Sequence, residues 1–218
     1  MTPDDVLKGL YDETMIGNAP AVLELTNQGL EIGMTPETIL FDALIPSLEE
    51  VGARFERGDY FVPEMLIAGR AMSGALDVLR PLLVAQGVES IGTFLMGTVK
   101  GDVHDIGKNL VNIMLEGAGF QVIDIGVQVP PEKFIAAIEE HNPDIVGMSA
   151  FLTTTMPMFK ANINAIEKAG LRDKVIIMVG GAPVTQEYAD VCGADAYAAD
   201  AATAVRRAKE LLAAKRAS

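Results

Sequence analysis

The hydrophobic pattern of this chain changes once, near residue 88, and that change constrains the fold more than any other feature. Residues 1–88 place apolar side chains three and four positions apart, the spacing of a helix face that packs against a core. After Gly87, short apolar runs alternate with helical stretches. We therefore expect two domains, residues 1–88 and 89–218, in a chain of 218 residues.

The first domain is predicted to contain helices only. Gly or Pro separates four helical stretches, Asp4–Ile16, Pro20–Ile32, Pro36–Phe55 and Pro63–Leu83. Because short connections make neighbouring helices antiparallel, the expected product is a four-helix bundle.

The second domain is predicted to alternate strands with helices. The strands are expected at Ile91–Met96, Gln121–Ile125, Ile145–Ser149, Val175–Val179 and Ala194–Ala198. Helical stretches follow them near 107–118, 131–140, 157–169, 184–192 and 200–214. This alternation predicts a parallel sheet covered on both faces, so the fold class is a helical bundle followed by a flavodoxin-like, doubly wound, five-stranded sheet.

Three loops should meet at the carboxyl edge of that sheet, where such folds bind ligands. The loop after the first strand, Gly97–Gly107, carries one of the two histidines, His104, two residues after Asp102. An imidazole can bind a metal through one nitrogen while the other donates a hydrogen bond to a carboxylate. His104 alone could supply one axial ligand to a metal cofactor, although it could not build a metal site.

The other two loops add hydroxyls and glycines to this edge. The loop after the third strand runs from Ser149 to Thr155 and is rich in threonine. The loop after the fourth strand begins with Gly180 and Gly181, which would let a large ligand approach the backbone closely. The three loops together favour a bulky ligand with a metal at one end and a polar tail.

Composition excludes several classes of partner. The net charge of −13 argues against nucleic acid and anionic membranes, and residues 1–88 hold 14 acidic side chains against 5 basic ones. No apolar stretch approaches the roughly 18 residues of a membrane span. The single cysteine, Cys192, fits a reducing cytoplasm and is expected to be buried packing, while His141 is expected at a helix end.

The spaced motifs resemble those of cobalamin-binding proteins. The cobalamin domain of that family carries Asp102-x-His104-x-x-Gly107, then Ser149, Leu152 and Thr153, then Gly180-Gly181. In the first domain, Val51–Met65 resembles the helical cap of cobalamin-dependent methionine synthase. The resemblance covers essentially the whole chain, and it favours the two-domain corrinoid proteins of methanol, methylamine, glycine betaine and methoxyaromatic methyltransferase systems.

The resemblance implies base-off, His-on cobalamin, with His104 as the lower axial ligand to cobalt. Asp102 would accept the other imidazole N–H, and Thr155 would extend the relay where methionine synthase has a serine. Ser149, Leu152 and Thr153 would surround the buried benzimidazole, and Gly180 and Gly181 would line the path of the tail. Phe55, Val62 and Met65 match apolar cap residues that cover the upper face.

The resemblance also implies a function in one-carbon metabolism. Bound cobalamin would cycle between Co(I) and methyl-Co(III), accepting a methyl group through one methyltransferase and passing it to a thiol or tetrahydropterin through another. The implied partners are a substrate-specific methyltransferase, an acceptor methyltransferase and a reductive activator. Such a corrinoid subunit is not catalytically complete alone, and the sequence identifies neither donor, acceptor nor oligomeric state.

Two other functions remain open from the sequence. A cobalamin sensor or storage protein would share the binding motif, but sensors add a DNA-binding module and the acidity opposes nucleic acid. The small subunit of a cobalamin-dependent mutase would also share it, but the methyl-type cap disfavours that. A dinucleotide loop, a Walker-type phosphate loop and a receiver-domain acidic pocket are poorly matched by the spacing of the glycines, lysines and aspartates.

Overall fold

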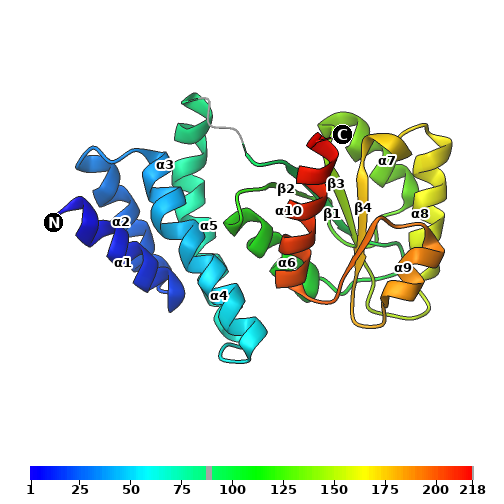
Figure 1. Ribbon diagram of the computed structural model, residues 1–218, viewed down its shortest axis with the longest axis horizontal. Helices are drawn as coiled ribbons and strands as arrows, with labels where there is room; N and C mark the ends of the chain where they lie inside the picture. Colours follow the sequence, from blue (N-terminus) through cyan, green and yellow to red (C-terminus); the bar gives the residue numbers. More distant parts are fainter. Residues whose placement is uncertain (87–89, 218) are drawn as a thin grey trace. The chain divides into compact units, whose positions relative to one another are not determined.

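The computed structural model describes residues 1–86 and 90–217, without the side chains of Glu56 and Val84 (Figure 1). Contacts between Cα atoms divide the chain into two compact units. The helical unit comprises Met1–Ser90 with Glu116–Gly119, and the α/β unit comprises Ile91–Leu115 with Phe120–Ser218. The predicted domain boundary between residues 88 and 89 lies outside the described residues.

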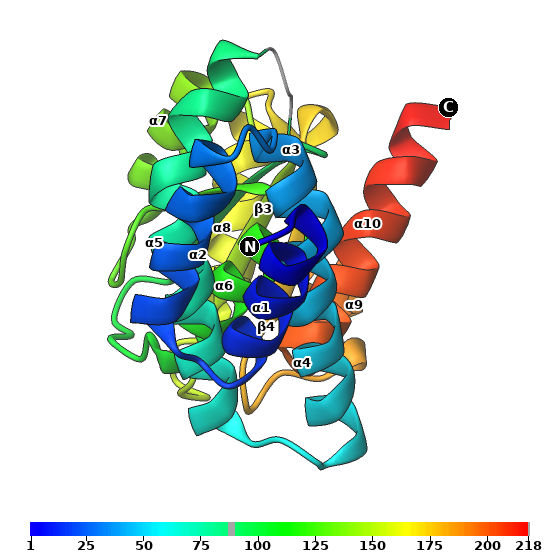
Figure 2. The same cartoon turned by 90° about the vertical axis from the view of Figure 1, so that its left-hand side faces the viewer.

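The helical unit contains antiparallel helices around an apolar core. Its elements are α1 (Pro3–Met15), α2 (Ala19–Glu31), α3 (Pro36–Ile39), the π-helical turn η1 (Leu40–Leu44), α4 (Ile45–Arg57) and α5 (Val62–Ala85). Helix α1 packs against α2 and α4, and α5 packs against the same two helices, as Figures 1 and 2 show. The fully buried side chains include Val6, Leu10, Val22, Ile39, Leu44, Leu48, Met72 and Leu79.

Local chemistry explains where these helices begin and where one departs from expectation. Thr2 and Asp5 form a reciprocal capping box at the start of α1, with the backbone N–H of each bonded to the side chain of the other. The single helix predicted over 36–55 is wrong in its middle, where η1 intervenes. Pro46 lacks the N–H that would continue the α-helical ladder, and the N–H of Ile45 instead reaches back to the carbonyl of Leu40.

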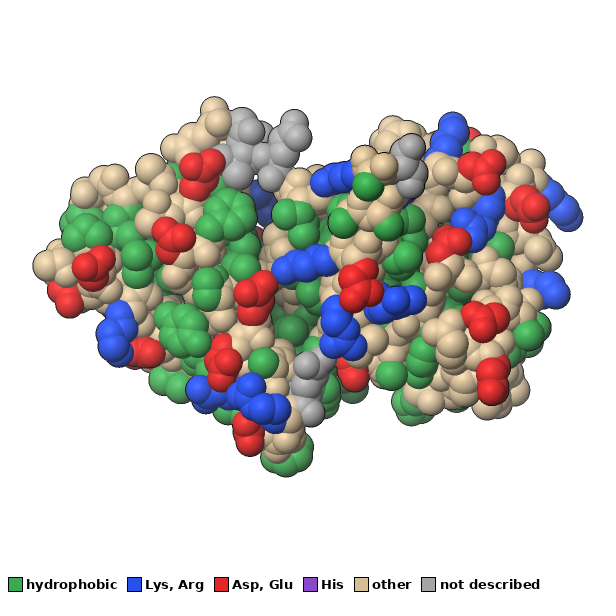
Figure 3. Space-filling view, viewed as in Figure 1, with side chains coloured by type: hydrophobic (Ala, Val, Ile, Leu, Met, Phe, Trp, Pro, Cys, Tyr) green, Lys and Arg blue, Asp and Glu red, His purple; other side chains and the backbone are tan. Residues whose placement is uncertain are grey.

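The surface of the helical unit is mixed rather than uniformly acidic. Figure 3 shows hydrophobic side chains reaching the surface between scattered acidic ones over these helices. The exposed large apolar residues of the unit include Ile16, Leu23, Ile32, Phe41 and Phe61. Its acidic charge is therefore interrupted by apolar surface.

The α/β unit is built on the predicted parallel sheet. Its strands are β1 (Thr93–Thr98), β2 (Gln121–Asp124), β3 (Ile145–Ser149), β4 (Ile176–Gly180) and β5 (Ala196–Ala198), in the order β2-β1-β3-β4-β5 with every pair parallel. The helices are α6 (Ile106–Gly117), α7 (Pro131–His141), α8 (Pro157–Lys168), α9 (Gln186–Cys192) and α10 (Ala201–Ala217), with a 3-10 turn, η2, at Arg172–Lys174. The flavodoxin-like order is confirmed.

Two glycines of the first loop lie in regular structure instead. The first strand begins at Thr93 and runs on to Thr98, so Gly97 belongs to β1. Helix α6 begins at Ile106, so Gly107 lies in its first turn. The loop that carries His104 is therefore Val99–Asp105, shorter than expected, and both of its ends are fixed by regular structure.

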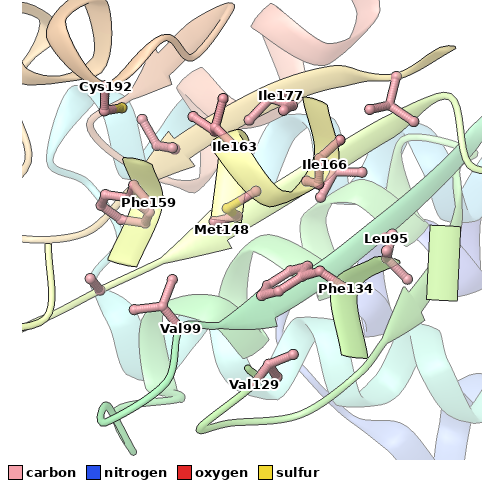
Figure 4. Close-up of a cluster of buried hydrophobic side chains, with 14 of the residues drawn as sticks. Leu95, Val99, Val129, Phe134, Met148, Phe159, Ile163, Ile166, Ile177 and Cys192 are labelled. Carbon is pink, nitrogen blue, oxygen red and sulfur yellow. The ribbon is translucent and has the colours of Figure 1, made fainter. Parts of the chain in front are cut away.

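The main core of this unit lies between the sheet and helices α7, α8 and α9. Figure 4 shows the strand residues Leu95, Met148 and Ile177, together with Val99 just after β1, facing apolar side chains of these helices. The helices contribute Phe134, Phe159, Ile163, Ile166 and Cys192. Helices α6 and α10 cover the opposite face (Figure 1).

Cys192 and His141, the two residues predicted to lie outside the site, are placed by the structure. The prediction that Cys192 is buried packing is confirmed, and burial raises the pKa of its thiol. His141 is the last residue of α7, as predicted, but the left-handed residue that closes the helix is Asn142, with φ 46°. No helix among the described residues is long and apolar enough to cross a membrane.

The register of the sheet brings the three predicted loops to one edge. Thr98 of β1 lies opposite Ser149 of β3, and Ser149 lies opposite Gly180 of β4. These are the last residues of their strands, so the segments that follow them start side by side. The site expected at the carboxyl ends of the strands is therefore assembled by strand pairing.

Candidate functional site

The centre of the site is a hydrogen-bonded pair formed by Asp102 and His104. The Oδ1 atom of Asp102 lies 2.7 Å from Nδ1 of the imidazole and 3.0 Å from the backbone N of His104. The tight loop after β1 permits both contacts because only one residue separates the two side chains. The first part of the predicted arrangement, a histidine held by its neighbouring carboxylate, is present.

The carboxylate of Asp102 is fully buried and saturated with donors. Its second oxygen, Oδ2, accepts hydrogen bonds from the backbone N–H of Phe151 at 2.8 Å and of Leu152 at 3.2 Å. Burial acts to raise the pKa of Asp102, but hydrogen bonds from the His104 and Phe151 backbones, the Thr155 hydroxyl and the imidazole outweigh it. They hold that pKa well below its usual range, so Asp102 is an acceptor only.

Thr155 lies where the relay hydroxyl was predicted. Its Oγ1 donates to Oδ2 of Asp102 at 2.7 Å and also lies 2.8 Å from the carbonyl oxygen of Leu152. The side chain is 7% exposed, and its methyl group lies on the side of Gly101, where an added Cβ would meet it at 3.5 Å. The extra methyl of threonine is therefore accommodated without displacing the hydroxyl from the carboxylate.

Two hydroxyls at the ends of β1 and β3 connect the His104 loop to the sheet. The Oγ1 atom of Thr98 lies 2.9 Å from Oγ of Ser149 and donates to the carbonyl of His104 at 3.2 Å. Thr98 is fully buried at the end of β1. Ser149 therefore engages the loop through Thr98, a contact that its predicted role beside a buried ring did not include.

The part of the imidazole that does not contact Asp102 is exposed, and an aromatic ring stacks on it. The side chain of His104 is 44% exposed, and no hydrogen bond to its Nε2 atom is found among the described residues. The ring of Phe151 stacks on the imidazole, with 4.4 Å between the ring centroids and 26° between the planes. Apolar side chains at this edge are exposed, namely Val103, Ile106, Phe151 and Leu152.

The glycines of the motifs differ in whether the protein's own structure requires a glycine at their positions. A Cβ added to Gly181, with φ 129°, would lie 1.9 Å from the carbonyl oxygen of Ala150, and one added to Gly180 would lie 2.9 Å from that of Ala198. Close approach of the protein's own backbone therefore already requires these two glycines. By contrast, a Cβ at Gly107 would meet nothing within 4 Å, so no contact within the described chain demands a glycine there.

The remaining predicted residues are distributed between the two units. Leu152 and Thr153 are exposed in the turn that follows β3. In the helical unit, Phe55 is half-buried on α4, Val62 is 37% exposed at the start of α5, and Met65 is buried on α5. The covering role predicted for these three cap residues stays a prediction.

Sequence reasoning missed several residues that build the site. Phe151 contacts both members of the central pair, and the N–H of Gln128, held at φ 53°, donates to the Asp102 carbonyl. Thr98 had a signal, because it is a lone hydroxyl at the end of an apolar strand. Phe151 had none, since an exposed aromatic residue after a strand suggests no particular partner.

The residues present fit a metal cofactor that takes one imidazole. Asp102 accepts from Nδ1, so Nδ1 carries a proton and Nε2 is the ring nitrogen left to bind a metal. No group of three or more His, Cys, Asp or Glu that could hold a metal ion occurs in the described part of the chain. Gly107 and the exposed apolar side chains around His104 suit a large, flat, partly apolar ligand.

Comparisons with known proteins agree with this geometry. A family model described as a B12 binding domain matches residues 92–209, and a second model of that description matches residues 6–80. The fold and the site thus define a cobalamin-binding protein.

The relatives specify the family more narrowly. The dimethylamine corrinoid protein of Methanosarcina barkeri is 43% identical over 214 residues, covering 98% of this chain and all of that one. The trimethylamine corrinoid protein of the same organism is 40% identical over 191 residues, 87% of this chain and 88% of that one. The methanol:cobalamin methyltransferase complex MtaBC from M. barkeri contains a chain with a TM-score of 0.86 and 28% identity, with 96% of this chain and 80% of that chain covered.

This chain therefore belongs to the B12-binding corrinoid proteins, the methyl carriers of methyltransferase systems. The resemblance and the methyl-carrier function that it implied are confirmed at this level, and so is cobalamin as the class of cofactor.

Proposed function

We propose that the chain carries a methyl group for a methylamine methyltransferase system, on cobalamin bound base-off with His104 as the lower axial ligand. The observation that carries this proposal is the central pair. A fully buried, saturated carboxylate holds one nitrogen of a half-exposed imidazole and leaves the other nitrogen without a partner among the described residues. When bound, cobalamin supplies a cobalt atom that accepts and releases the methyl group.

Each residue of the pair has a separate task in this proposal. Asp102 holds the proton on Nδ1, so that Nε2 is the ring nitrogen that His104 presents to the metal. Thr155 supplies one of the hydrogen bonds that keep the carboxylate ionised in its buried position. These contacts would restrict the imidazole and so favour binding through preorganisation.

The surrounding residues are proposed to bind the rest of the cofactor. Gly107 leaves room beside the His104 loop, while Ser149, Leu152 and Thr153 on one loop and Gly180 and Gly181 on the next would line the path of the nucleotide tail. Phe55, Val62 and Met65 of the helical domain, residues 1–88, would cover the reactive face and exclude water.

The substrate and partners are also part of the proposal. Relatives named for dimethylamine and trimethylamine make methylamines the first donors to test. We propose three protein partners, namely a substrate-specific methyltransferase, a methyltransferase for a thiol or tetrahydropterin acceptor, and a reductive activator. The cytoplasmic location predicted from the single cysteine stays a prediction.

The test is an anaerobic visible spectrum of the full chain reconstituted with cobalamin and then desalted. The wild type should retain corrinoid, His104→Ala should change the spectrum of the oxidised cofactor, and His141→Ala should not. His141 is the matched control because it is the other histidine and is itself exposed at the end of α7. Failure of the wild type to retain corrinoid, or identical spectra for His104→Ala and wild type, would reject His104 ligation.

A further inference from the structure

Phe151 touches both members of the central pair, in two different ways. Its backbone N–H donates to Oδ2 of Asp102 at 2.8 Å, and its ring stacks on the imidazole of His104 at 4.4 Å. We propose that Phe151 is a positioning residue that holds the imidazole in the orientation that presents Nε2 to the cofactor. This inference rests on the proposed function and adds a residue to its binding machinery.

The need for a second contact follows from the geometry of the first. The hydrogen bond from Nδ1 to Asp102 fixes one atom of the ring, but coupled changes in the two side-chain torsions of His104 can still tilt the ring plane while that bond is kept. The side chain of His104 is 44% exposed, so burial does little to restrict it. A flat ring stacked 26° from parallel with the imidazole restricts that rotation, because turning the imidazole would break the stack.

The backbone of Phe151 is anchored to the same carboxylate as the imidazole. The N–H of Phe151 is bonded to the same carboxylate that holds Nδ1, so the Phe151 main chain and the imidazole share one anchor. The carboxylate, the imidazole and the phenyl ring therefore form one unit. Phe151 is 51% exposed, so the placement of its ring is not explained by burial in a core.

The next residue offers a natural comparison. Leu152 also donates its N–H to Asp102 and is 40% exposed, but it has no ring to stack. Phe151→Leu would thus give position 151 the properties that position 152 already has, removing the stack while keeping the backbone hydrogen bond. Phe151→Tyr keeps the ring and serves as the rescuing variant.

The first measurement uses cofactor-free protein and NMR of the imidazole protons. The chain has two histidines, so His141 provides an internal reference and His104→Ala assigns the remaining signals. The ring current of Phe151 should shift the His104 signals in the wild type and in Phe151→Tyr, and the shift should vanish in Phe151→Leu. Phe41→Leu is the matched control, because Phe41 is 43% exposed and lies on η1 of the helical unit.

The second measurement is the dissociation constant for cobalamin with the full chain, alongside thermal unfolding. Phe151→Leu should weaken binding by about 2- to 10-fold, the range expected from losing one aromatic stack. Phe151→Tyr and Phe41→Leu should bind as the wild type does. Equal melting temperatures of the cofactor-free variants would show that the loss is one of orientation and not of folding.

The outcomes separate this inference from the function on which it rests. Unshifted His104 signals in the wild type, or wild-type affinity in Phe151→Leu despite a lost shift, would overturn the positioning role and leave His104 ligation standing. Corrinoid that the wild type does not retain would overturn the proposed function itself. Loss of affinity in Phe151→Leu with recovery in Phe151→Tyr would support the inference.

Discussion

Two acid–base pairs flank the start of α6, and they differ in which member is buried. In the first, Asp102 is fully buried and the side chain of His104 is 44% exposed. In the second, the side chain of Lys108 is 2% exposed and that of Asp124 is 36% exposed. The first pair buries the acid and exposes the base, and the second does the reverse.

The pairs differ most in what their exposed members have left to bind. Asp124 accepts from Lys108 and from Asn112 Nδ2 at 3.0 Å through one oxygen, and from the Gly126 N–H at 2.8 Å through the other. Lys108 also donates to Asn109 Oδ1 at 2.8 Å. In contrast, Nε2 of His104 has no hydrogen bond among the described residues. A pair whose exposed member keeps an unused atom is suited to ligand binding, whereas a saturated pair is structural.

Asp102→Asn should cause the largest loss of cobalamin affinity, because it removes the buried acid of the first pair. An amide cannot accept at both positions, so it would lose hydrogen bonds and release the tautomer of His104. Cobalamin affinity should fall by about 10- to 100-fold, as for other second-layer partners of a metal-binding histidine. Equilibrium binding measures this, with the exposed neighbour Asp105→Asn as control. Equal affinities for the two variants would show that the buried carboxylate does not control the ligand.

Lys108→Met should affect stability without affecting the ligand. Removing the ammonium leaves Asp124 without its charged partner, and the free energy of unfolding should fall by about 1–3 kcal/mol. Urea denaturation of cofactor-free protein measures this, and Lys100→Met, at an exposed lysine, should change little. Cobalamin affinity of the folded variant should match the wild type. A marked loss of affinity would mean that the second pair also supports binding.

Thr155→Val tests whether the Thr155 hydroxyl supports the Asp102–His104 pair. Valine keeps the shape of threonine but removes the 2.7 Å hydrogen bond to Asp102. Affinity for cobalamin should fall by about fivefold, corresponding to one hydrogen bond of about 1 kcal/mol. Thr155→Ser keeps the hydroxyl and should bind nearly as the wild type does. Equal binding by the valine and serine variants would exclude the hydroxyl from the relay.

Gly107→Ala should have the smallest effect of these substitutions, and it should change stability and cobalamin affinity in opposite directions. Gly107 lies in the first turn of α6 with open space around it, so alanine should raise the stability of cofactor-free protein by about 0.5–1 kcal/mol. The new methyl should nevertheless weaken cobalamin binding. Gly74→Ala, also helical and open, should stabilise without weakening binding. Unchanged affinity in Gly107→Ala would mean that the cofactor does not approach that turn.

The fold was predictable because its signals are periodic and local. The alternation of apolar runs and helical stretches predicted the parallel, doubly wound sheet, and the flavodoxin-like order is the one expected for that fold class. The two-residue spacing of Asp102 and His104 indicated the central pair. The π turn at Leu40–Leu44 was missed because Pro46 near a predicted helix interior does not reveal how the ladder adapts. The extension of β1 to Thr98 was missed because a glycine after an apolar run predicts the start of a loop, whereas Gly97 lies inside the strand.

The candidate site was predictable only in part, for a physical reason. The side chains of Asp102 and His104 lie two positions apart, so their contact could be anticipated from the sequence. The stack of Phe151, the saturation of Asp124 and the tie between Thr98 and Ser149 join segments far apart in the chain. Such contacts depend on exact register and side-chain direction, which a single sequence does not specify.

The sequence separations between Asp102 and its hydrogen-bond donors also bear on when, during folding, the protein becomes able to bind its cofactor. The donors to Oδ2 of Asp102 lie 49 to 53 residues further along the chain, while its contact with His104 spans two. Closing a loop of that length costs entropy, which only the pairing of β1 with β3 repays. A nascent chain that ends before β3 carries the whole histidine motif and yet has no preformed receptor. Cofactor capture should therefore begin late in folding, and it would report that the centre of the sheet is complete.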